Sequence, residues 1–460
     1  MSAVTLDSES SRLRTRRTLS SGSARLRTVR HGGATVEGRL EFLRQPLCCA
    51  EPMEPPVDCL ISVPKFGPPP RTDPSAGGGG GLGRGRRLVV SKLNTGGDPP
   101  SARGGHTATL VGDKIYLFGG HELRGADKGF AYHNAVFVLD LKGRRWVPFK
   151  KQKGTPAAPR YGHTASLFRS RIIIFGGKGG PNLYFQDLNA LDVDNATWYK
   201  GLSRRGDPGA RFWHSSNISG DHMYVFGGAC GSTLLGDLHA LNLTTMEWQE
   251  LKPRGRAPRP RVAHASALAN GYLLIHGGMA RTVLEDTQAE ASALNAADLA
   301  TWYLGDLHAL SLSALTWHRL RVQGDLPTPR MGHTLAPLGN SLLLWGGWPH
   351  RNSTRASMYN PDSKQQELMM ASAPTDSDPT AALLLQSEEP QEIPLQDAAA
   401  LCSYTGEWSP IFVRGKTPAC RYGHSQSETP SGVVVLGGWT SPVPLMEALL
   451  IQEEEEETAS

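Results

Sequence analysis

The stretch PRYGHTASLFRSRIIIFGGKGGPNLYFQDLNALDVDNATW, from Pro159 to Trp198, is one complete unit of a pattern that recurs along the chain. It opens with an Arg-x-x-His element at Arg160 and His163 and continues with an apolar run that ends in the double glycine Gly176-Gly177. An Asp-Leu-x-Ala-Leu segment and a tryptophan follow. Because the same order of features is found again on both sides of this stretch, the chain is a repeat protein, and the repeat decides the fold.

Six copies of the unit can be aligned, each with an Arg-x-x-His element upstream of a double glycine. The opening elements are Arg103/His106, Arg160/His163, Arg211/His214, Arg261/His264, Arg330/His333 and Arg421/His424. The double glycines are Gly119-Gly120, Gly176-Gly177, Gly227-Gly228, Gly277-Gly278, Gly346-Gly347 and Gly437-Gly438. Successive double glycines are 57, 51, 50, 69 and 91 residues apart, so two of the steps contain insertions.

Each unit has the pattern of four short β-strands separated by Gly, Pro and Asp turns, with β-branched and aromatic residues in the second strand. A single sheet of this size leaves both faces uncovered, so the units must pack face to face. Radial packing of such sheets gives a β-propeller, which has only short edges. We therefore predict an all-β, six-bladed propeller. The tryptophans expected to fill the space between its blades are Trp146, Trp198, Trp248, Trp317 and Trp408.

These motifs resemble the kelch family, in the Arg-x-Gly-His subclass that is seen in host cell factor and in kelch-only ubiquitin-ligase adaptors. The resemblance covers about residues 86 to 451, and the repeat length is that of kelch units, roughly 50 residues. It implies a six-bladed kelch β-propeller. It also implies a role in binding proteins or peptides, for which members of the family use arginines at the propeller mouth.

The two ends of the repeat region predict how the ring closes. Residues 87–103 resemble a fourth strand and the connection after it, whereas residues 421–451 supply three strands and then stop. The N-terminal strand is therefore expected to complete the last blade. The predicted domains are a disordered leader at 1–85, basic and then rich in Pro and Gly, the propeller at 86–451, and an acidic tail at 452–460.

Two blades carry insertions between their second and third strands, at about 279–305 and 348–396. Residues 289–302 within the first insertion have the pattern of a short helix. Strands alternate in direction within a blade, so both insertions are expected on the face that also carries the connections between blades.

Composition restricts the class of protein. With 460 residues, 39% of them hydrophobic, the chain can bury a sizeable core. No apolar run approaches the length of a membrane span, and no secretory signal pattern is present. Six scattered cysteines without a Cys-x-x-Cys element indicate reduced thiols. We expect a cytoplasmic protein, with the nucleus as the alternative, and neither a cofactor nor a metal site.

The face with the inter-blade connections is the predicted binding surface. Its loops are basic at 150–160, 203–211 and 252–261, and aromatic residues follow the arginines or the double glycines. Arg with Trp and Tyr is the composition of protein-binding hot spots, and guanidinium groups bind carboxylates through two hydrogen bonds. The expected partner is a protein or peptide with acidic or carboxylate groups. The candidate partner-binding residues are Arg160, Tyr161, Arg211, Phe212, Trp213, Arg330, Trp348, Arg421, Tyr422 and Trp439.

The same residues have a structural interpretation, which the sequence leaves open. One arginine per blade at a fixed register suits a contact with a neighbouring backbone or side chain at the channel mouth. The six histidines suit satisfied core residues, because imidazoles spread around a ring do not converge as metal ligands do.

The predicted function is that of a non-enzymatic interaction scaffold or substrate-recognition adaptor. The alternatives are an adaptor of a trafficking or cytoskeletal complex and a metal-dependent enzyme built on a propeller. No nucleophile, base and orienting group stand out, and a link to a ubiquitin ligase would need a docking element other than a BTB or F-box region. Nucleic acid is disfavoured, since the net charge is only +5 and no nucleic-acid motif is present.

Overall fold

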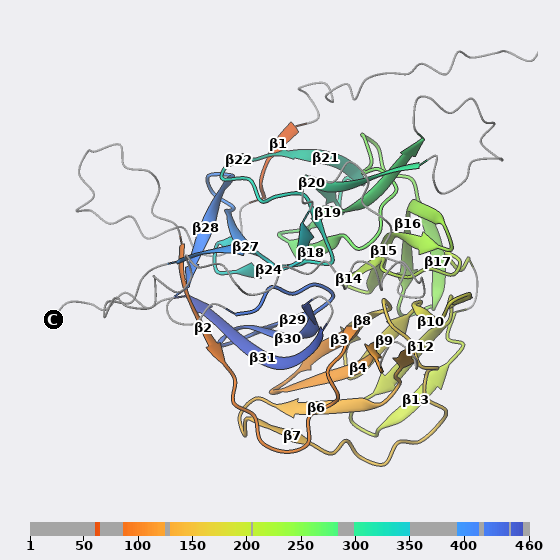
Figure 1. Ribbon diagram of the computed structural model, residues 1–460. Coiled ribbons are helices and arrows are strands. Elements are labelled where there is room, and N and C mark those ends of the chain that lie inside the picture. The colour runs from red at the N-terminus through yellow and green to blue at the C-terminus, as the bar shows by residue number, and fades with distance from the viewer. Residues whose placement is uncertain are drawn as a thin grey trace, which may run out of the picture. The chain divides into compact units, whose positions relative to one another are not determined.

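A computed structural model describes residues 60–64, 86–124, 129–203, 206–283, 299–349, 393–413, 418–440 and 443–453. These residues form six antiparallel blades around a common centre, as Figure 1 shows. The predicted all-β, six-bladed propeller is therefore confirmed.

The first three blades follow one another along the chain. Blade 1 consists of β3 (Gly104–Val111), β4 (Lys114–Leu123), β6 (Val136–Asp140) and β7 (Arg145–Val147), with the short β5 (Phe130–Tyr132) paired to β4. Blade 2 consists of β8 (Thr164–Phe168), β9 (Arg171–Phe175), β12 (Leu188–Asp192) and β13 (Thr197–Lys200), with the hairpin β10 (Lys178–Gly180) and β11 (Leu183–Tyr184) beside it. Blade 3 consists of β14 (Ser215–Ser219), β15 (His222–Cys230), β16 (Thr233–Asn242) and β17 (Glu247–Leu251).

The other three blades carry the additional strands. Blade 4 consists of β18 (Ala265–Ala269), β19 (Tyr272–Val283), β20 (Leu299–Ser311) and β21 (Thr316–Arg321), extended by β1 (Leu60–Ser62). Blade 5 consists of β24 (Thr334–Leu338), β25 (Ser341–Trp345), β27 (Ile393–Cys402) and β28 (Glu407–Val413), to which β22 (Gln323–Gly324) is paired; β23 (Arg330–Met331) pairs with β26 (Trp348–Pro349). Blade 6 consists of β29 (Ser425–Thr429), β30 (Gly432–Thr440), β31 (Val443–Glu453) and β2 (Arg86–Lys92).

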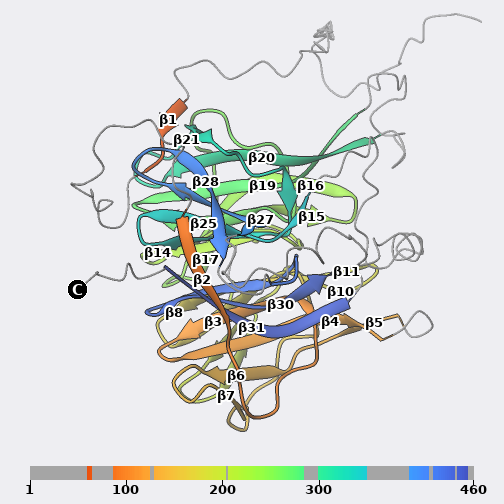
Figure 2. The same cartoon turned by 60° about the vertical axis from the view of Figure 1, so that its left-hand side comes forward.

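The ring closes through β2, as the sequence predicts. This N-terminal strand pairs antiparallel with β31, with Val90 opposite Ile451, and becomes the outer strand of blade 6. Its first residues also pair in parallel with β28 of blade 5, so one continuous sheet joins the last two blades. Figure 2 shows β2 lying beside both β28 and β31.

The core lies between the blades. Each of the six interfaces between neighbouring blades, called seams below, contains a cluster of buried aliphatic side chains. In five of these seams the tryptophan on the fourth strand of one blade packs against the preceding blade. Trp146, for example, shares a cluster with Leu436 of blade 6. The predicted role of these tryptophans as packing residues is confirmed.

Two segments differ from expectation within the described residues. Leu60–Ser62, inside the predicted leader, forms β1 and pairs in parallel with β21, and Val63 behind it is buried among residues of blades 4 and 5. The insertion after Gly278 begins as paired strand, because β19 and β20 continue to Val283 and from Leu299. Residues 299–302 are therefore strand instead of the end of a helix.

Other sequence predictions fall outside the described residues. They concern the rest of the leader, residues 284–298 and 350–392 of the two insertions, and residues 454–460 of the acidic tail. In the part of the chain that is described, no helix is long and apolar enough to cross a membrane.

Candidate functional site at the propeller mouth

Each blade contributes one pair of residues to the mouth of the propeller, on the face where the blades are connected. The first member directly follows the arginine of the Arg-x-x-His element, and the second directly follows the double glycine. Backbone pairing holds the two side by side. These mouth pairs are Gly104/His121, Tyr161/Lys178, Phe212/Ala229, Val262/Met279, Met331/Trp348 and Tyr422/Trp439.

A closed ring of backbone hydrogen bonds surrounds the channel next to the mouth pairs. The residue two positions after each arginine donates its N–H to the carbonyl of the equivalent residue in the preceding blade, with N···O distances of 2.7 to 2.9 Å. All six residues have φ between 51° and 66°, a left-handed conformation that glycine adopts without strain. The ring consists of Gly105, Gly162, Trp213, Ala263, Gly332 and Gly423.

Trp213 places a large side chain in this ring, where four of the other blades have glycine. A Cβ atom on Gly162 would lie 3.3 Å from Trp213 Cδ1, and one on Gly423 would lie 3.2 Å from Trp213 Cη2. Gly423 belongs to blade 6, which faces blade 3 across the channel. The indole therefore reaches across the channel to blade 6.

The arginines of the Arg-x-x-His elements are buried and hold their own blades together. In each blade the Nη1 atom donates to the carbonyl of the first glycine of the pair, as from Arg160 to Gly176 at 2.9 Å. In blades 2, 3 and 4 the guanidinium also forms two hydrogen bonds to the aspartate that begins the third-strand motif. In blade 6, Arg421 also contacts a carboxylate, but it donates only one hydrogen bond, from Nη2 to Glu447.

This geometry bears on four of the predicted binding residues, Arg160, Arg211, Arg330 and Arg421. All four are buried at 3% exposure or less, and their guanidinium groups already have acceptors within the chain. A ligand carboxylate would have to displace those acceptors. The structure therefore supports a structural role for these four arginines, and their role in partner binding stays a prediction.

The six histidines connect neighbouring blades and are also buried. In five seams the Nε2 atom of one blade's histidine forms a hydrogen bond with the Ser or Thr that follows the histidine of the preceding blade, at 2.8 to 3.0 Å. Burial, the largest cause, and the nearby arginine lower the pKa of these imidazoles, to about 3 for His106 and His264. They are neutral structural groups near pH 7.

One seam uses a different partner. The residue that follows His264 is Ala265, which has no hydroxyl group, and His333 instead forms a 2.9 Å hydrogen bond with His276. His276 stands directly opposite Ala265 in the β18–β19 register, where other blades pair Ser or Thr with Phe, Trp or Leu. The polar group has moved across the strand pair.

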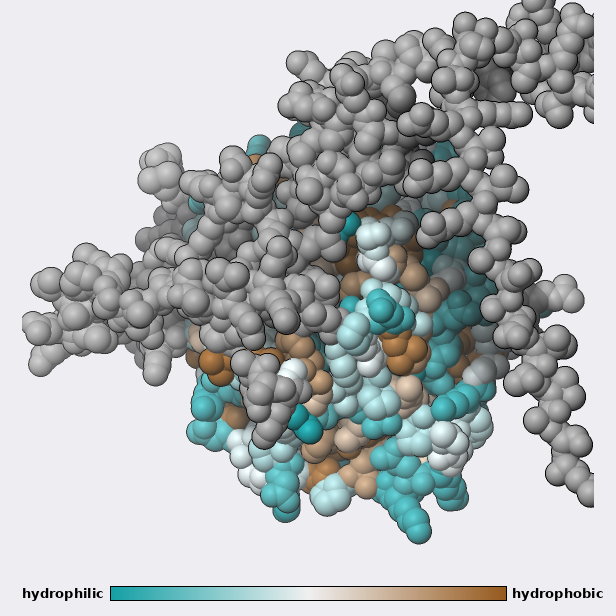
Figure 3. All heavy atoms as spheres, turned by 45° about the vertical axis from the view of Figure 1, so that its right-hand side comes forward, coloured by the Kyte–Doolittle hydropathy of each residue, from teal (hydrophilic) through white to brown (hydrophobic). Residues whose placement is uncertain are grey.

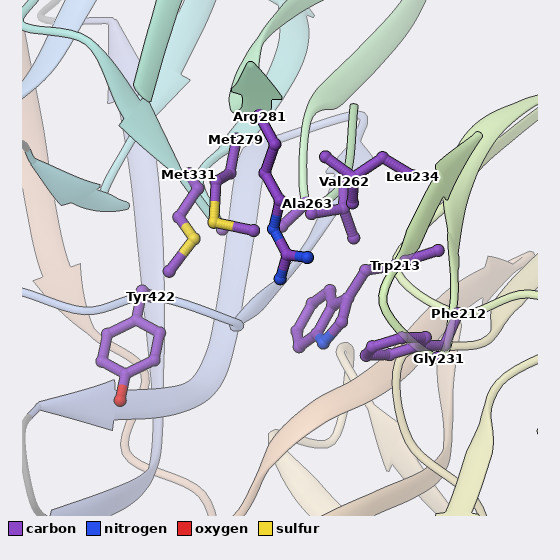
Figure 4. Close-up of a pocket in the computed structure, with 12 residues that line it drawn as sticks. Phe212, Trp213, Gly231, Leu234, Val262, Ala263, Met279, Arg281, Met331 and Tyr422 are labelled. Carbon is purple, nitrogen blue, oxygen red and sulfur yellow. The ribbon is translucent and has the colours of Figure 1, made fainter. Parts of the chain in front are cut away.

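A pocket opens at the mouth between blades 3 and 6. Its walls come from four consecutive mouth pairs and from β15, β16 and β19, and most of its side chains are apolar. The lining residues are Phe212, Trp213, Ala229, Gly231, Leu234, Val262, Ala263, Met279, Arg281, Met331, Gly332 and Tyr422. Figure 4 shows Met279, Met331 and Tyr422 on one side of this space and Phe212, Trp213, Val262 and Leu234 on the other.

The predicted aromatic residues divide between this pocket and a filled sector of the mouth. Phe212, Trp213 and Tyr422 line the pocket, and Trp348 contacts Tyr422 with ring centroids 5.2 Å apart. Tyr161 and Trp439 are buried and pack on either side of His121, with centroids 4.3 and 5.1 Å away. Trp439 fits there because Gly104 has no side chain. This sector is occupied by the chain's own rings.

Sequence reasoning missed several pocket residues, among them Met279, Met331 and the charged Arg281. Arg281 lies at the end of β19, three residues after the double glycine, and Figure 4 shows its guanidinium reaching into the space between Met279 and Trp213. The sequence contains only a weak indication that Arg281 belongs to the site, because this arginine lies at the edge of an insertion and outside the repeated pattern. Its position depends on the extension of β19 and β20 beyond the blade.

Within the described ranges, no group of three or more His, Cys, Asp or Glu is placed to hold a metal ion. The pocket lining offers thioethers, aromatic rings and one guanidinium, which suit contacts with an apolar side chain and an anion.

Comparisons with known proteins agree with the geometry. Residues 124–347 match the model of a family described as KLHDC2/KLHL20/DRC7 Kelch-repeats domain. The chain is 36% identical over 292 residues, 62% of its length, to Tip elongation aberrant protein 1 of Schizosaccharomyces pombe, and the match covers 23% of that protein. It is 34% identical over 154 residues, 31% of its length, to Host cell factor 1 of Homo sapiens, covering 8% of that protein. The chain thus spans less than a quarter of the length of these relatives.

Proposed function

We propose that this chain, a β-propeller whose repeats match the kelch model, is a non-enzymatic scaffold or substrate-recognition adaptor, because that family indicates a role in protein interaction. It binds a protein or peptide at the propeller mouth. The observation that carries this proposal is the pocket between blades 3 and 6, where aromatic and methionine side chains converge on an open space. Clusters of this composition are typical of binding hot spots and adaptable apolar contacts.

The rest of the visible surface supports the same location. Large exposed apolar side chains elsewhere in the described residues are scattered, at Leu183, Leu315, Leu326 and Val443. On the part of the surface that Figure 3 leaves visible, hydrophobic residues form separate brown patches between teal hydrophilic ones. Single exposed apolar residues are normal, whereas a concave apolar group next to a charged side chain is the usual form of a binding site.

The complex in which the adaptor works has two candidates. Similarity to the kelch-only ubiquitin-ligase adaptors supports a substrate-recognition subunit. The match to a protein named Tip elongation aberrant protein 1 supports the alternative of a trafficking or cytoskeletal adaptor. The identity of the proteins that copurify with this chain separates the two.

The test is affinity purification of the full chain with mass spectrometry, in parallel with the variant Phe212→Ala/Tyr422→Ala. Both side chains are partly exposed at the pocket, so the variant removes two aromatic contacts. We expect the captured partners to fall by at least about tenfold, since truncation of a hot-spot residue costs about 2 kcal/mol or more.

The matched control is Leu315→Asn, which removes an exposed apolar side chain on the opposite face, in the turn between β20 and β21. Leu315 has φ of 46°, and asparagine tolerates that conformation. Circular dichroism checks that both variants fold. Partners that persist in the folded pocket variant would place binding elsewhere and contradict the proposal.

A further inference from the structure

The outer edge of blade 4 is covered by a segment that belongs to none of the repeats. β1 pairs in parallel with β21, and Ile61 is opposite Leu320. Val63, which directly follows β1, is 3% exposed and belongs to the same core cluster as Leu320 and Trp408, in the seam between blades 4 and 5. Figures 1 and 2 both show β1 at the outside of the propeller, next to β21.

The same register is used a second time, by β2 on blade 5. Arg86 is opposite Ile411, and both Ile411 and Leu320 lie three residues after the tryptophan of their strand. Two residues further along, Leu88 is buried in the seam between blades 5 and 6, as Val63 is in the seam between blades 4 and 5. The outer edges of these two blades are therefore equivalent sites for a parallel strand.

The structure holds the two N-terminal strands with different numbers of pairs. β2 pairs with three residues of β28 and with five residues of β31, so it has a strand on each side. β1 pairs with three residues of β21 and is the terminal strand of its sheet in the described structure. Short elements with few buried contacts open at the lowest free-energy cost. We therefore expect β1 to leave its edge while the propeller stays folded.

We propose that the outer edge of blade 4 is a second binding surface, which takes an extended segment of a partner protein by parallel strand addition, and that β1 is the chain's own occupant of it. The incoming segment forms backbone hydrogen bonds with β21 and places a β-branched aliphatic side chain where Val63 lies. Gly406 of blade 5 borders this position, since a Cβ atom on it would lie 3.9 Å from Val63 Cγ2. This surface is separate from the mouth pocket, to which β21 contributes no residue.

The register indicates which partner segment competes best with β1. Leu60 and Ser62 are opposite Arg319 and Arg321, and both arginines are exposed. Neither Leu60 nor Ser62 is charged, so β1 offers these arginines no opposite charge at the paired positions. Opposite charges directly across a strand pair are favourable. A partner segment with Asp or Glu at the positions of Leu60 and Ser62 should therefore bind more tightly than the chain's own strand.

The test uses the full chain with the substitution Val63→Asp, which places a charge in the buried seam and should release β1. The probe is a fluorescein-labelled synthetic peptide of residues 57–66, with serine in place of Cys59. Fluorescence anisotropy should show at least about tenfold tighter binding to the variant than to the wild type, because a site that its own segment occupies most of the time binds a competitor correspondingly weakly. The control Leu326→Asp places the same charge at a residue that is 61% exposed and should behave as the wild type.

Altered peptides identify what the edge recognises. Aspartate in place of Val63 should abolish binding, and so should N-methylation of both Ile61 and Ser62, which removes the backbone N–H that faces β21. Glutamate in place of both Leu60 and Ser62 should tighten binding about 2- to 30-fold, the range for two opposite-charge pairs. An excess of this glutamate peptide should displace β1 from the wild-type chain and speed amide hydrogen exchange in residues 57–66.

Hydrogen exchange of the wild type alone gives a measurement that needs no substitution. The amides of residues 60–62 should exchange at least about tenfold faster than those of residues 89–91 in β2, because β1 opens locally whereas β2 opens with blade 6. This comparison decides the matter if Val63→Asp does not fold, which circular dichroism checks.

Four contrary results would each remove a part of the proposal. Equal binding of the peptide to the wild type and to folded Val63→Asp, or binding to neither, would show that this edge is not a site closed by β1. Equal protection of β1 and β2 would make β1 a permanent part of the propeller. A glutamate peptide that binds no tighter would overturn the preference for an acidic segment. A wild-type dimer in light scattering that Val63→Asp abolishes would place a second copy of this chain on the edge. None of these results bears on the mouth pocket.

Discussion

Arg261 is fully buried between the carbonyl of Gly277 and the two oxygens of Asp306, and Arg281, on the same blade, lies among apolar side chains without a carboxylate. Burial by itself would raise the pKa of Asp306, but hydrogen bonds from His308 and Arg261 hold it well below its usual range. The carboxylate therefore stays ionised and neutralises Arg261. At the residue scale, the Asp306 carboxylate is what makes Arg261 a structural group.

Replacing Asp306 with Asn should destabilise the propeller. The change leaves the Arg261 charge buried without a counterion, which costs about 3 kcal/mol when one partner of a buried pair is removed. Urea unfolding followed by circular dichroism measures the difference. Asp325→Asn, at an exposed site, is the control and should change stability by about 0.5 kcal/mol or less. Equal stabilities of the two variants would show that the Asp306 pair contributes nothing.

The sequence could predict that six arginines share a register, but not which groups they contact. In blades 2, 3 and 4 the partner of the arginine is the aspartate of the third-strand motif. A prediction that paired each arginine with the aspartate of its own repeat would have identified these buried pairs. Arg281 could not be found this way. Its environment is created by side chains from four blades, and no local spacing records that arrangement.

The β18–β19 pair shows how a change in one strand is compensated in its neighbour. Ala265 lacks the hydroxyl group that would form a hydrogen bond with His333, and His276, directly opposite Ala265 in the neighbouring strand, forms it instead. The ring of His276 still packs against Trp408, at 5.6 Å between centroids, as Phe175 packs against Trp248 at 5.1 Å. One strand pair thus keeps both the packing and the polar contact of the seam.

The variant His276→Phe should lose about 1–3 kcal/mol of unfolding free energy, because the Nε2 atom of His333 is left buried without a partner. Adding Ala265→Ser restores the Ser/Phe pair of blade 3 and should recover most of the loss. A double-mutant cycle of thermal or urea unfolding measures the coupling. Additive effects of the two substitutions would mean that His333 does not depend on this position.

At the level of strands, the repeat pattern predicted every blade and the strand that closes the ring, because inward-facing apolar runs and turns recur at fixed spacing. It did not predict β1. Its three residues have no repeat to belong to, and their pairing with β21 brings together positions about 260 residues apart. The extension of β19 and β20 was missed for a related reason. An insertion has no counterpart in the other blades, so its strand pairing cannot be predicted from the repeat.

The propeller as a whole is built on neutral histidines. Seven buried imidazoles, the six of the Arg-x-x-His elements and His276, have pKa values lowered mainly by burial. In the unfolded chain each takes up a proton near pH 6.5. Below that pH the unfolded state binds more protons than the folded state, so stability falls as the pH is lowered.

We expect the unfolding temperature to drop steeply between pH 7 and pH 5. Each histidine contributes up to about 1.4 kcal/mol per pH unit in that window. Circular dichroism melts at fixed ionic strength measure the effect. The double variant Ala265→Ser/His276→Phe has one buried imidazole fewer and should lose stability less steeply. An unfolding temperature that is constant from pH 7 to pH 5 would contradict the assignment of neutral buried histidines.

The closure of the ring by β2 also has a mechanical consequence. Leu88 is opposite Glu453 and Lys92 is opposite Leu449, so the segments that lead away from the propeller leave it at the same end of this ladder. Tension applied between residues 86 and 453 therefore breaks the hydrogen bonds between β2 and β31 one after another, starting at this end. It does not shear all of them at the same time. A pull applied at residues 86 and 453 would therefore open blade 6 at low force while the five covalently continuous blades still resist.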